Sequence, residues 1–178
     1  MAISDSVQRL FETNETHENA SAWRIGVVTA QFNDHITGAL LASAKQTLLA
    51  QGILEANLVE VIVPGAFELP LAAQWLIEKS KIDAVITLGC VIQGETPHFD
   101  YVCAEAARGV QDVQLKTGVP VVFGVLTTHT EAQALDRTSH NQPANGGTSR
   151  HSDKGIDCAL TALHMLTLKQ QLLQLPCS

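Results

Sequence analysis

Short apolar runs alternate with segments of helical periodicity along most of the chain. Four apolar runs rich in β-branched residues predict strands, at residues 24–29, 58–63, 84–88 and 119–126. Apolar residues elsewhere recur every three or four positions and predict helices, at residues 36–48, 68–79, 99–113, 131–137 and 156–167. This alternation predicts an α/β fold, and the almost wholly apolar strands predict a parallel sheet with helices on both faces.

Two segments fall outside this alternation. Residues 1–22 are polar and aperiodic, so we interpret them as a flexible N-terminal arm that precedes a single domain at residues 23–178. Residues 139–153 are rich in turn-forming residues but too few for a domain linker. They predict a long loop inside that domain.

Composition narrows the class of protein. Only 4% of the 178 residues are aromatic whereas 46% are apolar, so the core must be aliphatic. A formal charge of -7 argues against a general nucleic-acid binder, which needs a basic face. No apolar run reaches the roughly 18 residues of a membrane span, and the first residues do not resemble a secretory signal. The four cysteines form no CxxC pair, which is typical of a reduced, cytoplasmic protein.

Ligands of an open parallel sheet bind beyond the carboxyl ends of the strands, near the point where the strand order reverses. This rule selects four segments, at residues 30–33, 64–68, 89–98 and 127–129. Phe32 and Phe67 lie in these segments, and aromatic faces stack well on flat heterocycles. The alternative, which the sequence leaves open, is that both rings only close the end of the core.

The segment from Gly94 to His98 carries the clearest chemistry. Thr96 predicts a helix N-cap, and Pro97 predicts the first helical residue. The backbone amides at such a helix start would form an anion site, provided that the Glu95 side chain points away. His98 on the first turn could relay protons near neutral pH. The alternative is a capped helix start with an exposed histidine.

Other candidate sites carry less weight. Cys90 with His98 would suit a thiolate hydrolase, but a cysteine at a buried strand end is more often a small core residue. The two glycines of residues 89–94 lack the spacing of a dinucleotide-binding loop. Three histidines have a spacing that fits no tight zinc motif, namely His129, His140 and His151. We therefore expect neither a metal nor a cofactor.

Four motifs occur in the order VPGAFELP, LGCVIQGETPHFDYV, FGVLTTHTEAQALDR and DKGIDCALTAL. Over residues 23–168 the chain resembles the lumazine synthases, the enzymes of the penultimate step of riboflavin biosynthesis. The resemblance implies a flavodoxin-like three-layer α/β/α sandwich with a four-stranded parallel sheet of order 2-1-3-4. It also implies the condensation of 5-amino-6-(D-ribitylamino)uracil with 3,4-dihydroxy-2-butanone 4-phosphate. The products are 6,7-dimethyl-8-ribityllumazine, phosphate and water, and the family uses no metal or organic cofactor.

The same resemblance implies roles for individual residues. His98 would transfer protons. Contacts to the pyrimidine and its ribityl chain would come from Phe32, Ala66, Phe67, Glu68, Cys90, Val91, Ile92 and Phe123. Contacts to the phosphate would come from Gly94, Glu95, Thr96, Arg137 and Lys154. Glu95 and Thr96 would use their amides, and a neighbouring subunit would supply Phe123 and Arg137.

Two features depart from the family pattern. Gln93 stands where many members carry Arg or Lys, so one positive charge near the anion site is missing. The segment between Arg137 and Lys154 is longer than the usual short linker, which leaves Arg150 as an alternative phosphate ligand.

Sites shared between subunits imply a homo-oligomer. We expect a pentamer rather than a shell of about 60 chains, because the longer segment at residues 139–153 would obstruct contacts between pentamers. Riboflavin synthase is a candidate partner, and no nucleic acid or membrane is expected. The alternatives are a catalytically weak relative that binds flavin or lumazine, a shell protein, and a hydrolase that depends on Cys90.

Overall fold

The structure, a computed structural model, describes residues 20–138 and 153–174. Its sheet has four parallel strands in the order β2-β1-β3-β4. The strands are β1 (Ile25–Ala30), β2 (Leu58–Val63), β3 (Ala84–Ile92) and β4 (Val121–Thr128). This arrangement confirms the parallel α/β fold and the strand order implied by the family resemblance.

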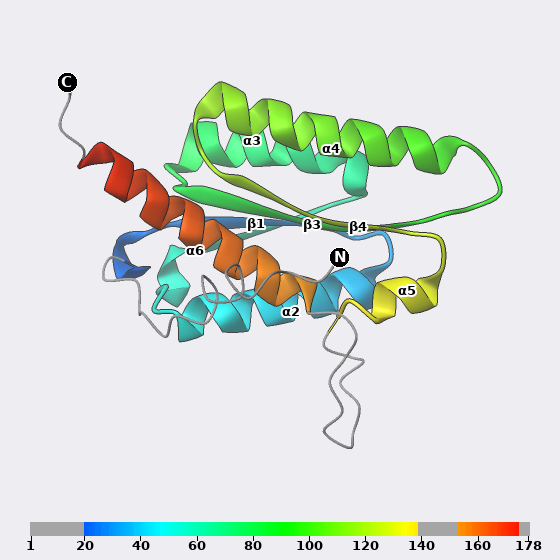
Figure 1. Cartoon of the computed structure of the whole chain (residues 1–178), viewed down its shortest axis with the longest axis horizontal. Helices are drawn as coiled ribbons and strands as arrows, with labels where there is room; N and C mark the ends of the chain where they lie inside the picture. Colours follow the sequence, from blue (N-terminus) through cyan, green and yellow to red (C-terminus); the bar gives the residue numbers. More distant parts are fainter. Residues whose placement is uncertain (1–19, 139–152, 175–178) are drawn as a thin grey trace, which may run out of the picture.

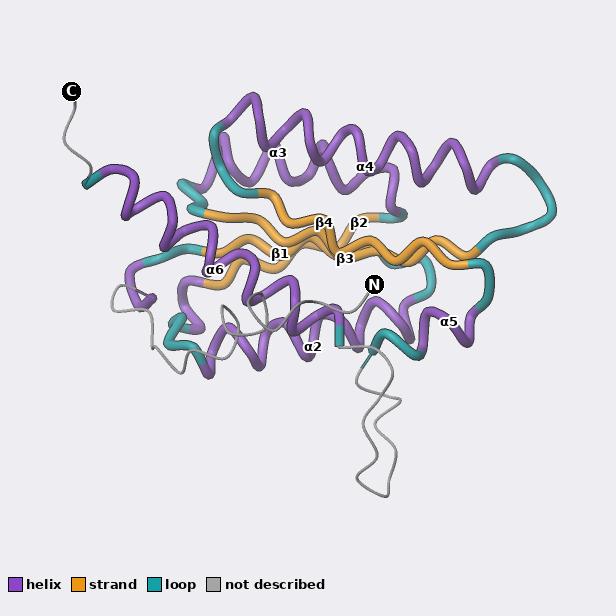
Figure 2. Tube along the Cα trace, viewed as in Figure 1, coloured by secondary structure: helices purple, strands orange, loops and turns teal. Residues whose placement is uncertain are grey.

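Helices cover both faces of the sheet, as Figures 1 and 2 show. Helices α2 (Asp34–Ala50) and α6 (Lys154–Leu173) lie on one face, and α3 (Leu69–Ser80) and α4 (His98–Thr117) lie on the other. Short elements complete the chain: the 3-10 helices η1 (Ala20–Ala22), η2 (Glu55–Asn57) and η3 (Ala66–Glu68), and helix α5 (Glu131–Leu135). Among the described residues, no helix is both long and apolar enough to cross a membrane.

The core is aliphatic on both sides of the sheet, as the composition requires. One cluster joins the sheet to α2 and α6, and the other joins it to α3 and α4. Helix α2 illustrates the sequence pattern: Ile36, Leu40 and Leu48 recur on one face and are completely buried. Burying each such side chain stabilises the fold by about 1.5–3 kcal/mol.

The observed strand β3 is longer than the sequence predicts, ending at Ile92 instead of residue 88. Gly89 resembles a strand end in the sequence, yet it pairs with Val125 and continues the ladder. A Cβ atom at this position would lie 3.1 Å from the Leu69 side chain and 3.2 Å from that of Val125. The glycine therefore allows close packing of helix α3 on the sheet, and it does not end the strand.

The first described residues already belong to the domain. Ala20–Ala22 form the turn η1, and the side chain of Ala20 is buried in the same cluster as Trp23. Ala20 therefore packs with the core residues that follow it in the chain. The remainder of the expected N-terminal arm, residues 1–19, lies outside the described residues.

Candidate active site at the carboxyl ends of the strands

A cavity of about 710 Å³ opens at the carboxyl ends of β1, β2 and β3. Its volume is typical of sites for small molecules. The residues that line it are Phe32, Pro64, Gly65, Ala66, Phe67, Glu68, Cys90, Val91, Ile92, Gly94, Thr96, His98, Phe99, Tyr101 and Val102. Three of the four segments selected by the sequence analysis therefore meet in one cavity.

Both phenylalanines of the cavity are exposed. The side chain of Phe32 is 70% exposed and that of Phe67 is 59% exposed. The alternative that these rings close the end of the core is therefore wrong. In an aromatic-poor chain, two exposed rings at one cavity are a surface suited to stacking on a flat heterocycle.

The loop that carries Phe32 is tied to both neighbouring strands. The backbone N–H of Phe32 donates to the carbonyl of Pro64 at 3.1 Å, after β2. The side-chain amide of Asn33 donates to the carbonyl of Cys90 at 3.0 Å, on β3. Asn33 itself has a left-handed backbone (φ 60°), a conformation that asparagine tolerates better than most residues. These bonds fix where the Phe32 ring stands above the strand ends.

Glu68 and its neighbours enter the cavity through a short turn after β2. Ala66, Phe67 and Glu68 form η3, in which Ala66 is buried while Phe67 and Glu68 are exposed. A Cβ atom at Gly65 would lie 3.2 Å from the Glu68 carboxylate, so glycine leaves room for that side chain. The carboxylate therefore stands at the cavity with acceptor oxygens available to hydroxyl groups.

Helix α4 begins at His98, one residue later than predicted. Pro97 occupies the N-cap position, and no side chain caps the helix, so the predicted capping role of Thr96 is wrong. The uncapped amides and the helix dipole still favour an anion at this end. Gly94, Thr96 and His98 line the cavity, whereas Glu95 does not. The Glu95 carboxylate therefore does not contribute to the lining of this cavity.

Cys90 does not have the properties of a nucleophile. Its side chain is only 2% exposed. Burial, and to a smaller extent the charge of Glu131, raises the pKa of the Cys90 thiol to about 11. The thiol is therefore protonated at neutral pH, which disfavours the hydrolase alternative.

Three expected site residues lie elsewhere in the chain. Phe123, Arg137 and Lys154 line a separate cavity of about 220 Å³ beside the edge strand β4, and this cavity shares no lining residue with the larger one. Arg137 donates from Nη1 to the carbonyl of Gln133 at 2.6 Å. The Lys154 ammonium pairs with Asp157 at 2.6 Å. A single chain therefore does not bring these residues to the larger cavity.

Comparison of the sequence with known proteins identifies the family of this chain. The model of the 6,7-dimethyl-8-ribityllumazine synthase family matches residues 22–170. The chain belongs to this family. It is 49% identical over 148 residues to the 6,7-dimethyl-8-ribityllumazine synthase of Cytophaga hutchinsonii, covering 83% of this chain and 87% of the relative. The corresponding protein of Phocaeicola vulgatus is 42% identical over 154 residues, covering 86% of each chain. That of Desulfatibacillum aliphaticivorans is 43% identical over 153 residues, covering 86% of this chain and 93% of the relative.

The residues at the two ends of the long segment contact each other in this lumazine synthase family member. The backbone N–H of Lys154 donates to the carbonyl of Arg137 at 2.9 Å, so the two ends of the segment lie side by side. Arg137 and Lys154 thus line one cavity despite the 16 residues between them in the sequence. The alternative residue Arg150 lies outside the described residues.

No metal centre is visible in the described part of this family member: it contains no group of three or more His, Cys, Asp or Glu side chains that could hold an ion. His129 contacts Gln93 there, and His140 and His151 lie outside the described residues.

The sequence analysis missed Phe99, Tyr101 and Val102 on the first turns of α4, which also line the larger cavity. Helical periodicity could have found Tyr101 and Val102, because positions three and four residues after His98 lie on the same face of a helix. Tyr101 is 69% exposed.

Proposed function

We propose that this chain catalyses the condensation of 5-amino-6-(D-ribitylamino)uracil with 3,4-dihydroxy-2-butanone 4-phosphate. The products are 6,7-dimethyl-8-ribityllumazine, phosphate and water, in the penultimate step of riboflavin biosynthesis. The observation that carries the proposal is the cavity that joins two exposed phenylalanines to His98 at the start of α4. Membership of the family supports the choice of substrates.

The pyrimidine half of the site lies near the ends of β1, β2 and β3. Phe32 stacks on the pyrimidine ring, and Glu68 accepts hydrogen bonds from the ribityl hydroxyls. Backbone groups of Cys90, Val91 and Ile92 recognise the edge of the ring. The exposure of Phe32 and the direction of Glu68 at the cavity support these roles.

The phosphate half of the site lies at the start of α4. Backbone amides of Gly94, Glu95 and Thr96 bind the phosphate, where the uncapped helix end favours negative charge. Arg137 and Lys154 of a neighbouring subunit add positive charge.

The chemistry needs proton transfers and leaving groups but no covalent bond to the protein. The 5-amino group attacks the ketone carbon, and loss of water leaves an imine. Loss of a proton from the carbon chain then expels phosphate, and the ribitylamino nitrogen closes the ring with loss of a second water. His98, exposed at the cavity, transfers protons in these steps and contributes a factor of about 10²–10⁴. Holding the two substrates together supplies up to about 7–11 kcal/mol of the remaining reduction in the barrier.

A complete site then requires two chains. Phe123 and Arg137 lie at a separate cavity of their own chain, which supports their use by a neighbour. In such an assembly, the smaller cavity of one chain meets the larger cavity of the next chain. This contact is head-to-tail, and head-to-tail contacts generate a ring when the rotation between neighbours closes. We propose a pentamer located in the cytoplasm, with riboflavin synthase as a candidate partner that would use the product.

An absorbance assay for lumazine formation from the two substrates tests the proposed function. The wild-type chain is expected to form product. His98→Ala is expected to slow formation by about tenfold or more without changing the oligomeric mass, because His98 is exposed and contributes little to packing. Cys90→Ala is the control at the same cavity and is expected to keep most of the activity. No product from the wild-type chain would refute the proposal, and unchanged turnover of His98→Ala would remove the proton-transfer role.

A further inference from the structure

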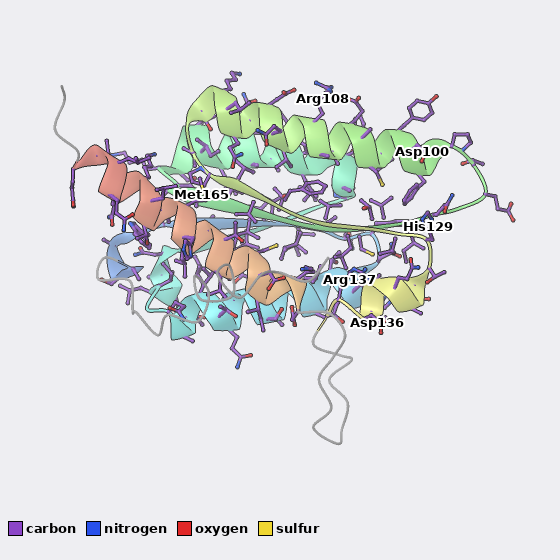
Figure 3. The ribbon with its side chains drawn as sticks, in the orientation of Figure 1. Asp100, Arg108, His129, Asp136, Arg137 and Met165 are labelled. Carbon is purple, nitrogen blue, oxygen red and sulfur yellow. The ribbon has the colours of Figure 1, made fainter. Side chains whose placement is uncertain are left out.

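His129 lies beside the phosphate half of the candidate site, although it lines neither cavity. It follows strand β4, and Figure 3 shows it at the same end of the molecule as Asp100 on the first turn of α4. Its backbone N–H donates to the side-chain oxygen of Gln133 on α5 at 2.9 Å. The position of His129 is therefore set by α5 as well as by the sheet.

The side chain of His129 contacts residues on both sides of the loop 94–98. Its Nδ1 atom is hydrogen-bonded to Oε1 of Gln93, the residue that precedes the loop. Its ring lies tilted against Phe99, the residue that follows the loop, with ring centroids 6.3 Å apart and planes at 33°. Gln93 is also held by its backbone N–H, which donates to the carbonyl of Thr128 at 2.9 Å.

The loop itself has little other support. Residues 94–98 are all exposed, and a Cβ atom at Gly94 would meet nothing within 4 Å. Among residues 20–138 and 153–174, no hydrogen bond joins Gly94, Glu95 or Thr96 to another element. The geometry of the loop therefore depends on its two ends, and His129 contacts both of them.

We propose that His129 is a positioning residue for phosphate binding, which holds the loop 94–98 through Gln93 and Phe99. The inference rests on the proposed function, because it assumes that this loop binds the phosphate of the second substrate. It goes further in assigning a role to a residue that does not touch the substrate.

Two substitutions separate positioning from packing. His129→Phe keeps a ring against Phe99 but removes the bond to Gln93, whereas His129→Asn keeps a polar group for Gln93 but removes the ring. We expect His129→Phe to raise the KM for the butanone phosphate about tenfold, the factor that corresponds to about 1.4 kcal/mol. The KM for the pyrimidine and kcat should stay within about twofold. His129→Asn should raise the KM for the butanone phosphate less than His129→Phe does.

Three results would overturn the inference: equal changes in both KM values, a change in kcat alone, or a rise in KM as large in His129→Asn as in His129→Phe. If His129→Phe fails to fold, Gln93→Leu removes the same bond from the other side and should give the same selective change in KM.

A calorimetric titration of the protein with inorganic phosphate separates this inference from the proposed function. If the wild-type chain forms no lumazine, the proposed function fails. Weaker phosphate binding by His129→Phe would then still support the positioning role, whereas equal binding would overturn it.

Discussion

At the scale of single residues, burial decides what the cysteines can do. Burial is the main cause that raises the pKa of Cys90 to about 11 and that of Cys158 to about 12. Both thiols therefore hold their protons more tightly in the folded chain than in the unfolded chain. The stability they contribute is complete below the ordinary thiol pKa of about 9, and it is lost as the pH rises toward 12.

This difference predicts a stability that falls at alkaline pH. The thermal midpoint of the wild-type chain should drop more between pH 8 and pH 10.5 than that of a Cys90→Ala/Cys158→Ala variant. Only the wild type has these two thiols, which ionise in the unfolded chain in this range while they stay largely protonated in the folded chain. The other ionisable groups are the same in both proteins and cancel in the comparison. Equal drops would show that the thiols are accessible in the folded state.

Arg137 gives a prediction about substrate selectivity. Arg137→Ala should raise the KM for the butanone phosphate by about 10- to 100-fold, the loss expected for a charge-assisted hydrogen bond, and change the KM for the pyrimidine much less. The assay is steady-state lumazine formation with each substrate varied in turn.

Arg108 is the matched control for this substitution. It lies on α4 (Figure 3), is exposed, and is bonded to Glu105 and Asp112, so Arg108→Ala should leave both KM values unchanged. Equal losses for both substrates in Arg137→Ala would indicate misfolding. If Arg150→Ala instead raised only the KM for the butanone phosphate, Arg150 in the long segment would be the phosphate ligand.

At the scale of elements, helices α2 and α6 meet through small groups. Asp153 caps α6 by accepting at Oδ1 from the N–H of Gly155 at 2.8 Å, and the same oxygen accepts from the Ser43 hydroxyl of α2 at 2.8 Å. A Cβ atom at Gly155 would lie 2.1 Å from that hydroxyl and 2.3 Å from the carbonyl of Leu40. This contact also fixes the start of α6, where Lys154 lies.

Two helical glycines should therefore respond in opposite ways to alanine. Gly155→Ala should destabilise the chain by about 1–3 kcal/mol, because the added methyl group forces the helices apart. Gly38→Ala, on the same helix α2 that Gly155 approaches, has nothing within 4 Å and should stabilise the chain by up to about 1 kcal/mol. Denaturant unfolding measures both, and a neutral Gly155→Ala would contradict the close contact.

The same scale shows how far the sequence could predict the fold. Periodicity predicted the bounds of β2 correctly at residues 58–63, because Pro64 and Gly65 end that strand. It missed the end of β3, since a glycine required for close packing resembles a glycine in a turn. Capping preferences placed the start of α4 one residue too early, since the observed backbone does not use Thr96 as the N-cap or Pro97 as the first helical residue.

The candidate site was predictable in outline for a physical reason. Parallel strands place their carboxyl ends at one edge of a sheet, so Phe32, Phe67 and His98 could be assigned to one region before any coordinates. Side-chain contacts were not predictable in this way. The bond between Gln93 and His129 joins residues 36 positions apart, and it depends on the register of β3 against β4.

At the scale of the whole molecule, the expected site residues divide between two cavities that share no lining residue. The larger one holds the groups suited to a heterocycle and to proton transfer, and the smaller one holds Arg137 and Lys154. Within the described residues of one chain, these two cavities stay separate. Assembly of several copies is the simpler way to complete the site, and this makes the oligomeric state part of the proposed mechanism.

The size of that assembly is the last prediction. The residues that flank the segment 138–153 meet through the bond between Arg137 and Lys154. In the family pattern the corresponding short linker lies at contacts between pentamers. A longer segment with Pro143, Gly146 and Gly147 should obstruct such a contact and lose conformational freedom if it were held there.

We therefore expect light scattering to give the mass of about five chains rather than that of a shell of about 60 chains. Replacing residues 139–152 by a linker of about six residues would remove the obstruction, and this variant should shift part of the protein to larger particles while keeping its activity. Residues 139–152 lie outside the described part of the chain, so this test depends on the sequence and on where the two ends meet. A shell formed by the unmodified chain would show that the segment does not obstruct the contact between pentamers.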